Sequence, residues 1–308
     1  MSSISINNII GRFAPSPTGP LHLGSLIAAT ASYLNVRQYV DSHWLLRIED
    51  LDTQRSQAAH STTIISQLEQ YGFKWDGEIV YQSQRTQAYQ EAFNQLTTSV
   101  FPCICTRKTL QATAQSQFSY IYPGTCRDQP IDSISNPYSY RLITAPTEIC
   151  FTDKIQGEFC QNLATDVGDF IIKRVDGSFS YQLAVVVDDA WQGINQITRG
   201  ADLLDNTPRQ LYLQKLLELP QPSYTHFPVI TTNDGKKLSK QNSSPAISNK
   251  HKRAALINVL RFLGQNPPDA SEFANLDDLW SFAMQNWSHS KIPKILSQTI
   301  PTRFNHYE

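Results

Sequence analysis

A short apolar run, a turn rich in proline and glycine, and a helix-forming run follow one another near the start of the chain. The apolar run covers residues 9–13, the turn covers 14–20, and the helical run begins at His22. Strand, glycine-containing turn and helix in this order form half of a βαβ unit. A second apolar run, at 44–50, suits a strand that is covered on both faces. These signals predict an α/β fold with a parallel sheet.

The pattern is interrupted in the middle of the chain and then resumes. Amphipathic helices are expected at 54–71 and 84–98, while residues 101–178 hold all five cysteines and many turn formers. The most strand-like run is Tyr181–Asp188. After it we expect a helix at 208–219, a strand at 227–230 and a helical end.

The expected organisation is therefore a split α/β domain around one insertion. It comprises a Rossmann-type catalytic domain over 1–100 and 179–245, an inserted subdomain over 101–178, and a short helical region over 246–308.

Composition and charge limit the class of protein. The net charge of −1, from 26 Lys+Arg and 27 Asp+Glu, means that any nucleic-acid surface must be a local patch. No apolar run is long enough for a membrane helix, and the first residues lack a secretion signal, so we expect a cytoplasmic protein without a membrane partner. Five cysteines in such a chain make a disulfide framework unexpected and favour a metal site or buried thiols.

Two segments have the composition of a phosphate-binding site. At the first, Gly24 lets backbone approach a ligand, the helix start presents N–H groups, and His22 can donate to a phosphate oxygen. At the second, Lys237 and Lys240 stand on a loop after a strand and can both reach a triphosphate. Each alone could be an ordinary turn. Because ligands of such sheets bind beyond the carboxyl ends of the strands, the pair predicts an ATP site in which His22, Lys237 and Lys240 are catalytic.

These motifs resemble those of class I aminoacyl-tRNA synthetases. The run His22-Leu-Gly-Ser25 resembles their HIGH motif, with Ser25 in place of the final histidine, and Lys237-Leu-Ser-Lys-Gln241 resembles their KMSKS loop. Three flanking runs resemble the glutamyl branch of that class: 11–19, 46–52 and 199–202. The resemblance covers about residues 9–245 and implies a Rossmann-type parallel sheet and an amino-acid-activating ligase.

The same resemblance implies that the amino acid is L-glutamate. Arg12, at the end of the first strand, can grip the side-chain carboxylate, and Glu49, at the end of the second, can hold the ammonium. The family positions also imply that Ser16, Tyr181 and Arg199 complete the pocket. The glutamate α-carboxylate would attack the α-phosphate of ATP, with Mg2+ on the phosphates and no protein nucleophile. The alternative for Arg47, Glu49, Asp50 and Asp52 is a surface ion-pair cluster.

The cysteines are spaced for a metal ion. Cys103, Cys105 and Cys126 offer three thiolates, which suit tetrahedral zinc. In the family resembled here a tyrosine just before the last cysteine is the fourth ligand, and Tyr122 matches it. We expect one structural Zn2+ per chain that pins the insertion, the alternative being three buried thiols without metal. Other candidates for the fourth ligand are Cys150, Cys160 and Asp128.

Few residues follow the lysine loop. Residues 246–308 are too few for the anticodon-binding domain of a full glutamyl-tRNA synthetase. This departure resembles the short paralogues of the branch, which activate glutamate without tRNA and attach it to queuosine in the anticodon loop of tRNA(Asp). The implied partners are ATP, L-glutamate and queuosine-bearing tRNA(Asp), bound by a monomer. The candidate phosphate contacts are Lys250, Lys252 and Arg253. The alternative is that these three residues form the solvated start of a helix.

Three other functions can be considered for the same sequence motifs. A truncated synthetase could charge the 3′ end of a tRNA instead. A nucleotidyltransferase can share the His-x-Gly element, but it lacks the amino-acid pocket that Arg12, Glu49 and Tyr181 predict. A non-catalytic RNA-binding module would not need His22, Lys237 and Lys240. The acceptor RNA and the roles of Cys150 and Cys160 do not follow from the residues.

Overall fold

The computed structural model describes residues 8–106, 108–110, 121–130, 134, 137–232 and 245–299. The expected lysine loop with Lys237 and Lys240 lies outside the described residues.

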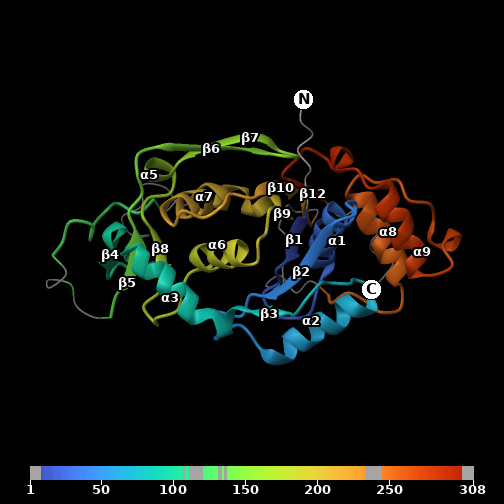
Figure 1. Ribbon diagram of the computed structural model, residues 1–308, viewed down its shortest axis with the longest axis horizontal. Helices are drawn as coiled ribbons and strands as arrows, with labels where there is room; N and C mark the ends of the chain where they lie inside the picture. Colours follow the sequence, from blue (N-terminus) through green and yellow to red (C-terminus); the bar gives the residue numbers. More distant parts are fainter. Residues whose placement is uncertain are drawn as a thin grey trace.

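A parallel sheet forms the centre of the molecule (Figure 1). In the described part of the chain it has five strands in the order β10-β9-β1-β2-β3. The strands are β1 (Ile9–Phe13), β2 (Ser42–Ile48), β3 (Val80–Tyr81), β9 (Gln196–Gly200) and β10 (Ser223–Phe227). Each strand runs parallel to its neighbours; in β1 and β2, for example, Arg12 lies opposite Leu45. The expected α/β class with a Rossmann-type parallel sheet is confirmed.

Helices connect and cover these strands. They are α1 (Leu23–Arg37) and α2 (Ala58–Gln70), with η1 (Gln82–Arg85) and α3 (Thr86–Gln95) after β3. In α2, Ile64 and Leu68 are fully buried, because the apolar face that the sequence pattern predicted packs on the core.

The larger hydrophobic core extends from this sheet to the last helices of the chain. These are α8 (Lys252–Phe262) and α9 (Leu276–Asn286), which lie beside α1 in Figure 1. Tyr33 of α1 packs edge-on against Trp44 of β2, with ring centroids 4.9 Å apart, and against Trp280 of α9 at 5.1 Å. The indole N–H of Trp280 donates to the carbonyl of Tyr71 at 2.9 Å. The C-terminal helices are therefore part of the core that supports the sheet.

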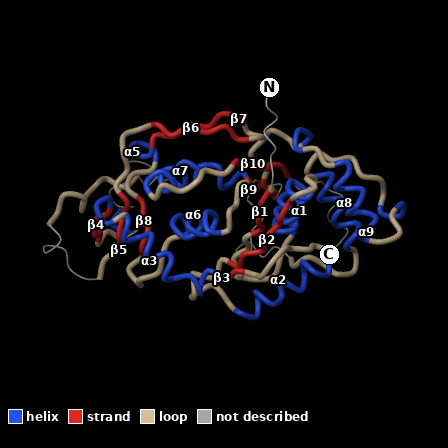
Figure 2. Tube along the Cα trace, viewed as in Figure 1, coloured by secondary structure: helices blue, strands red, loops and turns tan. Residues whose placement is uncertain are grey.

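A second, antiparallel sheet lies at the far side of α6 and α7 from α1 (Figures 1 and 2). Its described order is β4-β5-β8, and its strands are β4 (Val100–Cys103), β5 (Ser139–Leu142) and β8 (Phe170–Lys173). A separate hydrophobic cluster joins this sheet to three helices. They are α3, α6 (Tyr181–Trp191) and α7 (Thr207–Leu216).

The prediction of a strand at Tyr181–Asp188 is wrong, because this segment is the first part of helix α6. Ser180 caps the helix by accepting from the N–H of Leu183. Val185 and Val186 are buried in the cluster with α3 and α7, so burial outweighs the low helix propensity of valine. The strand next to β1 is instead β9, which carries Arg199.

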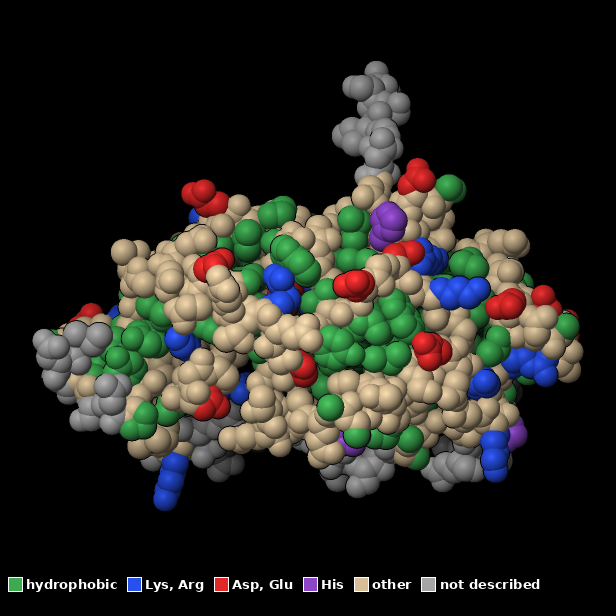
Figure 3. All heavy atoms as spheres, turned by 60° about the horizontal axis from the view of Figure 1, so that its bottom comes forward, with side chains coloured by type: hydrophobic (Ala, Val, Ile, Leu, Met, Phe, Trp, Pro, Cys, Tyr) green, Lys and Arg blue, Asp and Glu red, His purple; other side chains and the backbone are tan. Residues whose placement is uncertain are grey.

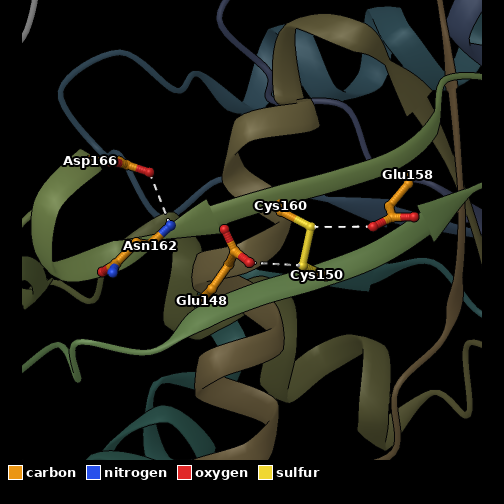
Figure 4. The surroundings of a disulfide bond; sticks show 6 residues. All are labelled: Glu148, Cys150, Glu158, Cys160, Asn162 and Asp166. Carbon is orange, nitrogen blue, oxygen red and sulfur yellow. Dashed lines mark hydrogen bonds between the residues drawn. A yellow bond between two sulfur atoms is a disulfide. The ribbon is translucent and has the colours of Figure 1, made fainter.

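A long hairpin lies along one edge of the molecule (Figure 1) and carries a disulfide (Figure 4). It consists of β6 (Glu148–Asp153) and β7 (Gly157–Asn162). Cys150 stands directly opposite Cys160 in the antiparallel register, and the two are bonded. The expectation that cysteines would serve only as metal ligands or buried thiols is therefore wrong for this pair.

The remaining described elements are short. They are η2 (Thr97–Ser99), α5 (Leu163–Asp166), η4 (Ala201–Asn206), β11 (Val229–Thr231), η6 (Ala270–Glu272), η7 (His289–Lys291) and β12 (Ser297–Thr299). Within the ranges described, no helix has both the length and the apolar character needed to cross a membrane. On the face seen in Figure 3, acidic and basic side chains are interspersed, in keeping with the net charge of −1.

Candidate active site

A cleft of about 520 Å³ opens at the carboxyl ends of the parallel strands. It is lined by the residues that end β1, β2 and β9, by the loop before α1 and by the first turn of α1. This is the edge at which open parallel sheets bind ligands. All described members of the predicted ATP and glutamate sets line it: Arg12, Ser16, His22, Gly24, Glu49, Tyr181 and Arg199.

His22 stands at the N-cap of α1. Its Nδ1 accepts from the backbone N–H of Ser25 at 3.4 Å, so in the neutral ring the proton is on Nε2, which can donate to a ligand. The first turn of α1 has no acidic residue, and its residues Gly24 and Ser25 line the cleft, so the positive end of the helix favours an anion there. A Cβ at Gly24 would lie 3.0 Å from the ring of His22, so this glycine makes room for the imidazole.

The described residues on both sides of the lysine loop lie beside this element. Ile230 of β11 is 3.6 Å from where a Cβ of Gly24 would lie. After the loop, Ala246 forms a β-bridge with His22, and the N–H of Ile247 donates to the carbonyl of Leu21 at 2.9 Å. The chain therefore leaves for residues 233–244 and returns from them next to His22.

Arg12 belongs to a buried network of charges at the base of the cleft. Its Nε and Nη2 donate to the carboxylate of Asp189 at 3.0 and 3.3 Å, and it is 4% exposed. Arg47, fully buried, donates to the same carboxylate at 2.8 Å. Two opposite charges outweigh the effect of burial, which would raise the pKa of Asp189, and hold that pKa below its ordinary value. Arg12 lines the cleft, and its Nη1 makes no hydrogen bond with the described residues.

Glu49 is a buried acid with an unsatisfied oxygen. Its side chain is 9% exposed, and within the described residues its Oε1 accepts no hydrogen bond, since the nearest guanidinium nitrogen, of Arg47, is 3.5 Å away. Burial raises the pKa of Glu49 to about 7, although Arg47 and Arg12 oppose the rise. Such an oxygen is a fitting acceptor for an ammonium group. The reading of Glu49 and Arg47 as a surface ion pair is wrong.

Tyr181 and Arg199 meet across the cleft from different elements. Tyr181 begins α6 and Arg199 lies in β9, and Arg199 Nη1 donates to Tyr181 Oη at 3.4 Å. Because Tyr181 Oη accepts from Arg199, its own proton can be donated to a ligand. The two residues thus present an N–H and an O–H donor to one region.

The predicted metal ligands also come together, at the end of β4. The Sγ atoms of Cys103, Cys105 and Cys126 lie within 4.8 Å of one another. Tyr122 Oη is 3.4 Å from Cys103 Sγ and accepts from the N–H of Cys126 at 2.8 Å. This cluster could bind a metal ion, and its thiol and phenol donors fit zinc. Of the other candidate ligands, Cys150 and Cys160 lie in the disulfide, and the exposed Asp128 does not belong to the cluster.

The basic residues before α8 differ in their surroundings. Lys250 is exposed, whereas Arg253 donates from Nη1 to the carbonyls of Phe273 and Ala274. Arg253 therefore ties α8 to the segment before α9, which reduces its value as a phosphate contact.

Several residues of the site were not predicted from the sequence. Asp188 binds Arg85 Nε at 2.6 Å and Tyr89 Oη at 2.7 Å, and Asp189 binds Arg12 and Arg47. Asp188 was hidden by the prediction of a strand at Tyr181–Asp188, and Asp189 follows directly after that predicted strand in the same helix. His226, which accepts a hydrogen bond from Arg199, was also not predicted. The sequence feature that could have indicated it is its position near the carboxyl end of β10, a strand of the same sheet.

Comparison with known proteins places these features in a family. The family model described as tRNA synthetases class I (E and Q), catalytic domain, matches residues 8–300. A glutamyl-Q tRNA(Asp) synthetase of Pseudomonas fluorescens is 46% identical over 299 residues, which are 96% of this chain and 98% of that protein. The protein of the same name from Thiobacillus denitrificans is 48% identical over 288 residues, 92% of this chain and 95% of its own.

Solved structures give a matching result. Glutamate-tRNA synthetase from Elizabethkingia anophelis is 25% identical with a TM-score of 0.79, over 96% of this chain and 69% of that one. A glutamate tRNA ligase from Elizabethkingia meningosepticum, solved in complex with its amino acid, is 25% identical with a TM-score of 0.77, over 96% and 67% of the two chains.

Proposed function

The chain belongs to the class I tRNA synthetases (E and Q) and among them to the glutamyl-Q tRNA(Asp) synthetases, and from this premise we propose how its cleft activates L-glutamate with ATP and transfers it to queuosine in the anticodon loop of tRNA(Asp). It is a ligase-type enzyme. One observation carries the proposal: a single cleft joins a helix N-terminus suited to phosphate to a buried pocket with an unsatisfied acid and two guanidinium groups.

The pocket recognises the three charged groups of glutamate: the α-ammonium, the side-chain carboxylate and the α-carboxylate. Glu49 accepts from the α-ammonium, which supplies the donor that its Oε1 lacks among the described residues. The Nη1 side of Arg12 binds the side-chain carboxylate, while Asp189 holds the other side of that guanidinium. Arg199 and Tyr181 add donors for a carboxylate, and Ser16 completes the wall of the cleft. A neutral amide in place of the side-chain carboxylate would offer Arg12 one uncharged acceptor oxygen and an NH2 group that cannot accept, which disfavours glutamine.

ATP lies with its phosphates at the start of α1. His22 donates from Nε2 to the α-phosphate as its charge grows, and Gly24 leaves the space that this ring needs. Lys237 and Lys240 neutralise the pyrophosphate. This role is supported by the described residues that follow 233–244, because Ala246 bridges to His22 and Ile247 to Leu21. The α-carboxylate of glutamate attacks the α-phosphate in line, so the protein positions charges and shuttles no proton. Mg2+ bound to the phosphates would supply further charge neutralisation.

Zinc bound by Cys103, Cys105, Tyr122 and Cys126 would have a structural role. The cluster joins the end of β4 to the segment around Tyr122, a part of the molecule with only a small hydrophobic cluster of its own. A metal ion there compensates for the lack of core. We take the insertion over 101–178 to be the acceptor side of a monomer and 1–100 with 179–245 to be its catalytic domain, with Lys250 and Lys252 as candidate contacts to RNA phosphates.

The proposal is tested by ATP–pyrophosphate exchange with each amino acid in the absence of tRNA. Exchange is expected with glutamate and not with glutamine, and Lys240→Ala should abolish it. Exchange that requires tRNA, or that survives Lys240→Ala unchanged, would contradict the proposed reaction.

A further inference from the structure

A buried chain of hydrogen bonds connects the turn of the β6–β7 hairpin to the cleft. Asp153 Oδ2, at the end of β6, lies 2.7 Å from His226 Nδ1. On the other side of the ring, Arg199 Nε donates to His226 Nε2 at 3.0 Å, and Arg199 Nη1 reaches Tyr181 Oη at 3.4 Å. The side chains of Asp153 and His226 are both 0% exposed. The chain thus runs from a hairpin remote in sequence to two residues of the amino-acid pocket.

The partners of His226 determine which of its nitrogens carries the proton. Arg199 Nε can only donate, so His226 Nε2 must accept and be unprotonated. The proton is then on Nδ1 and is donated to Asp153. Burial lowers the pKa of His226, and the positive charge of Arg199 lowers it further, against the effects of Asp153 and Asp202. The ring is therefore neutral, in one tautomer.

Asp153 is in turn fixed by the backbone. Its Oδ1 accepts from the N–H groups of Ile155 and Gln156, both at 2.9 Å, and from the N–H of His226 at 3.2 Å. Burial would raise the pKa of Asp153, but the hydrogen bond from His226 and those from the backbone keep it below its ordinary value. One carboxylate oxygen is thus committed to backbone donors, and only Oδ2 faces the imidazole.

Arg199 is held on its other side as well. Its Nη2 donates to Thr207 Oγ1 at 2.9 Å and, at 3.4 Å, to the carbonyl of Leu203. With Nε on His226 and Nη2 on these acceptors, the plane of the guanidinium is fixed, and Nη1 is the nitrogen directed to Tyr181 and the cleft. Removal of the His226 acceptor would leave that plane held from one side only.

We propose that Asp153 and His226 are positioning residues that orient Arg199, and through it Tyr181, for binding a carboxylate of the amino-acid substrate. This inference rests on the proposed function for the identity of the substrate. Neither residue touches the cleft wall, so each acts through Arg199. Partners of this kind, one contact removed from the binding group, contribute about 10- to 100-fold to affinity or activity at metal sites, and we expect a similar effect here.

The isosteric change Asp153→Asn gives a sharp test. The amide oxygen must take the place of Oδ1, because three backbone N–H groups point there. The amide NH2 then faces His226 Nδ1, which forces the ring proton to Nε2 and sets two donors, His226 and Arg199, against each other. Glu158→Gln is the matched control, since it makes the same chemical change on the outer face of the same hairpin.

In glutamate-dependent ATP–pyrophosphate exchange, Asp153→Asn should raise the KM for glutamate about 10-fold or more, with the KM for ATP and kcat little changed. Glu158→Gln should behave as the wild type. His226→Gln, which can keep an acceptor near Arg199, should retain more glutamate affinity than His226→Leu. An unchanged KM for glutamate in Asp153→Asn would overturn the inference while the proposed function stands.

The tautomer is measured independently of activity, by 15N NMR of the imidazoles in the ligand-free protein, with His226→Gln to assign the signal. We expect a protonated Nδ1 in the wild type and a protonated Nε2 in Asp153→Asn. A wild-type His226 protonated on Nε2, or on both nitrogens at neutral pH, would overturn the hydrogen-bond chain whatever the substrate is. A wild type that fails to exchange with glutamate while showing the expected tautomer would contradict the proposed function instead.

Discussion

Replacement of Glu49 by glutamine should make the ligand-free protein more stable than the wild type at high pH. The pKa of Glu49 rises from 4.5 to about 7 because the carboxyl is buried. Between these values the folded protein keeps a proton that the unfolded chain has released. The wild type therefore loses stability as pH rises through this window, whereas Glu49→Gln, which cannot ionise, does not.

The size of the effect follows from the same pKa. Each tenfold change in proton affinity is about 1.4 kcal/mol, so the wild type should lose about 3 kcal/mol relative to Glu49→Gln between pH 4.5 and pH 7. Side-chain exposure of only 9% means that solvent screening reduces this little. The assay is urea unfolding of both proteins from pH 4.5 to 8. A stability difference that is constant across this range would refute the reasoning.

The same substitution should impair glutamate binding, because the ammonium loses a charged partner. A cost of about 2 kcal/mol or more corresponds to a KM for glutamate about 30-fold higher in ATP–pyrophosphate exchange at pH 8. In the wild type, this KM should rise as pH falls below about 7, since protonated Glu49 no longer attracts an ammonium. Gain of stability with loss of binding distinguishes a binding residue from a structural one.

Three further predictions concern stability and metal content. Asp189→Asn leaves Arg12 and Arg47 without their shared carboxylate and should lower the free energy of unfolding by about 3 to 5 kcal/mol in urea; a loss below 1 kcal/mol would contradict the network. Cys150→Ser removes a disulfide between residues 10 apart and should lower the free energy of unfolding by about 2 to 3 kcal/mol under oxidising conditions. Dithiothreitol should lower the stability of the wild type and leave that of Cys150→Ser unchanged. Cys126→Ser should reduce zinc from about one per chain to near zero by elemental analysis, and zinc-free wild type would contradict the site.

Local patterns were sufficient for the elements that begin the fold. The apolar run of β1, the glycine turn and α1 are adjacent in sequence, so their order alone predicts the cleft edge and the residues at it. The same holds for Glu49, which follows β2 directly. The cysteines and Tyr122 were placed by spacing together with a family resemblance.

What could not be predicted depends on contacts between distant parts of the chain. Arg12 and Asp189 are 177 residues apart, and Asp153 and His226 are 73 apart, and no local pattern pairs them. The strand-like composition of α6 is overruled by tertiary burial, which a propensity argument does not contain. The Cys150–Cys160 pair required the hairpin register.

The most direct test of the account is the position at which activated glutamate is transferred. Radiolabelled glutamate, ATP and enzyme are incubated with tRNA(Asp) that carries queuosine, with unmodified tRNA(Asp), and with the modified tRNA after removal of its 3′-terminal adenosine. We expect labelling of both queuosine-bearing tRNAs, in the anticodon loop, and none of the unmodified tRNA. Label that depends on the 3′-terminal adenosine, or that reaches unmodified tRNA equally, would contradict it.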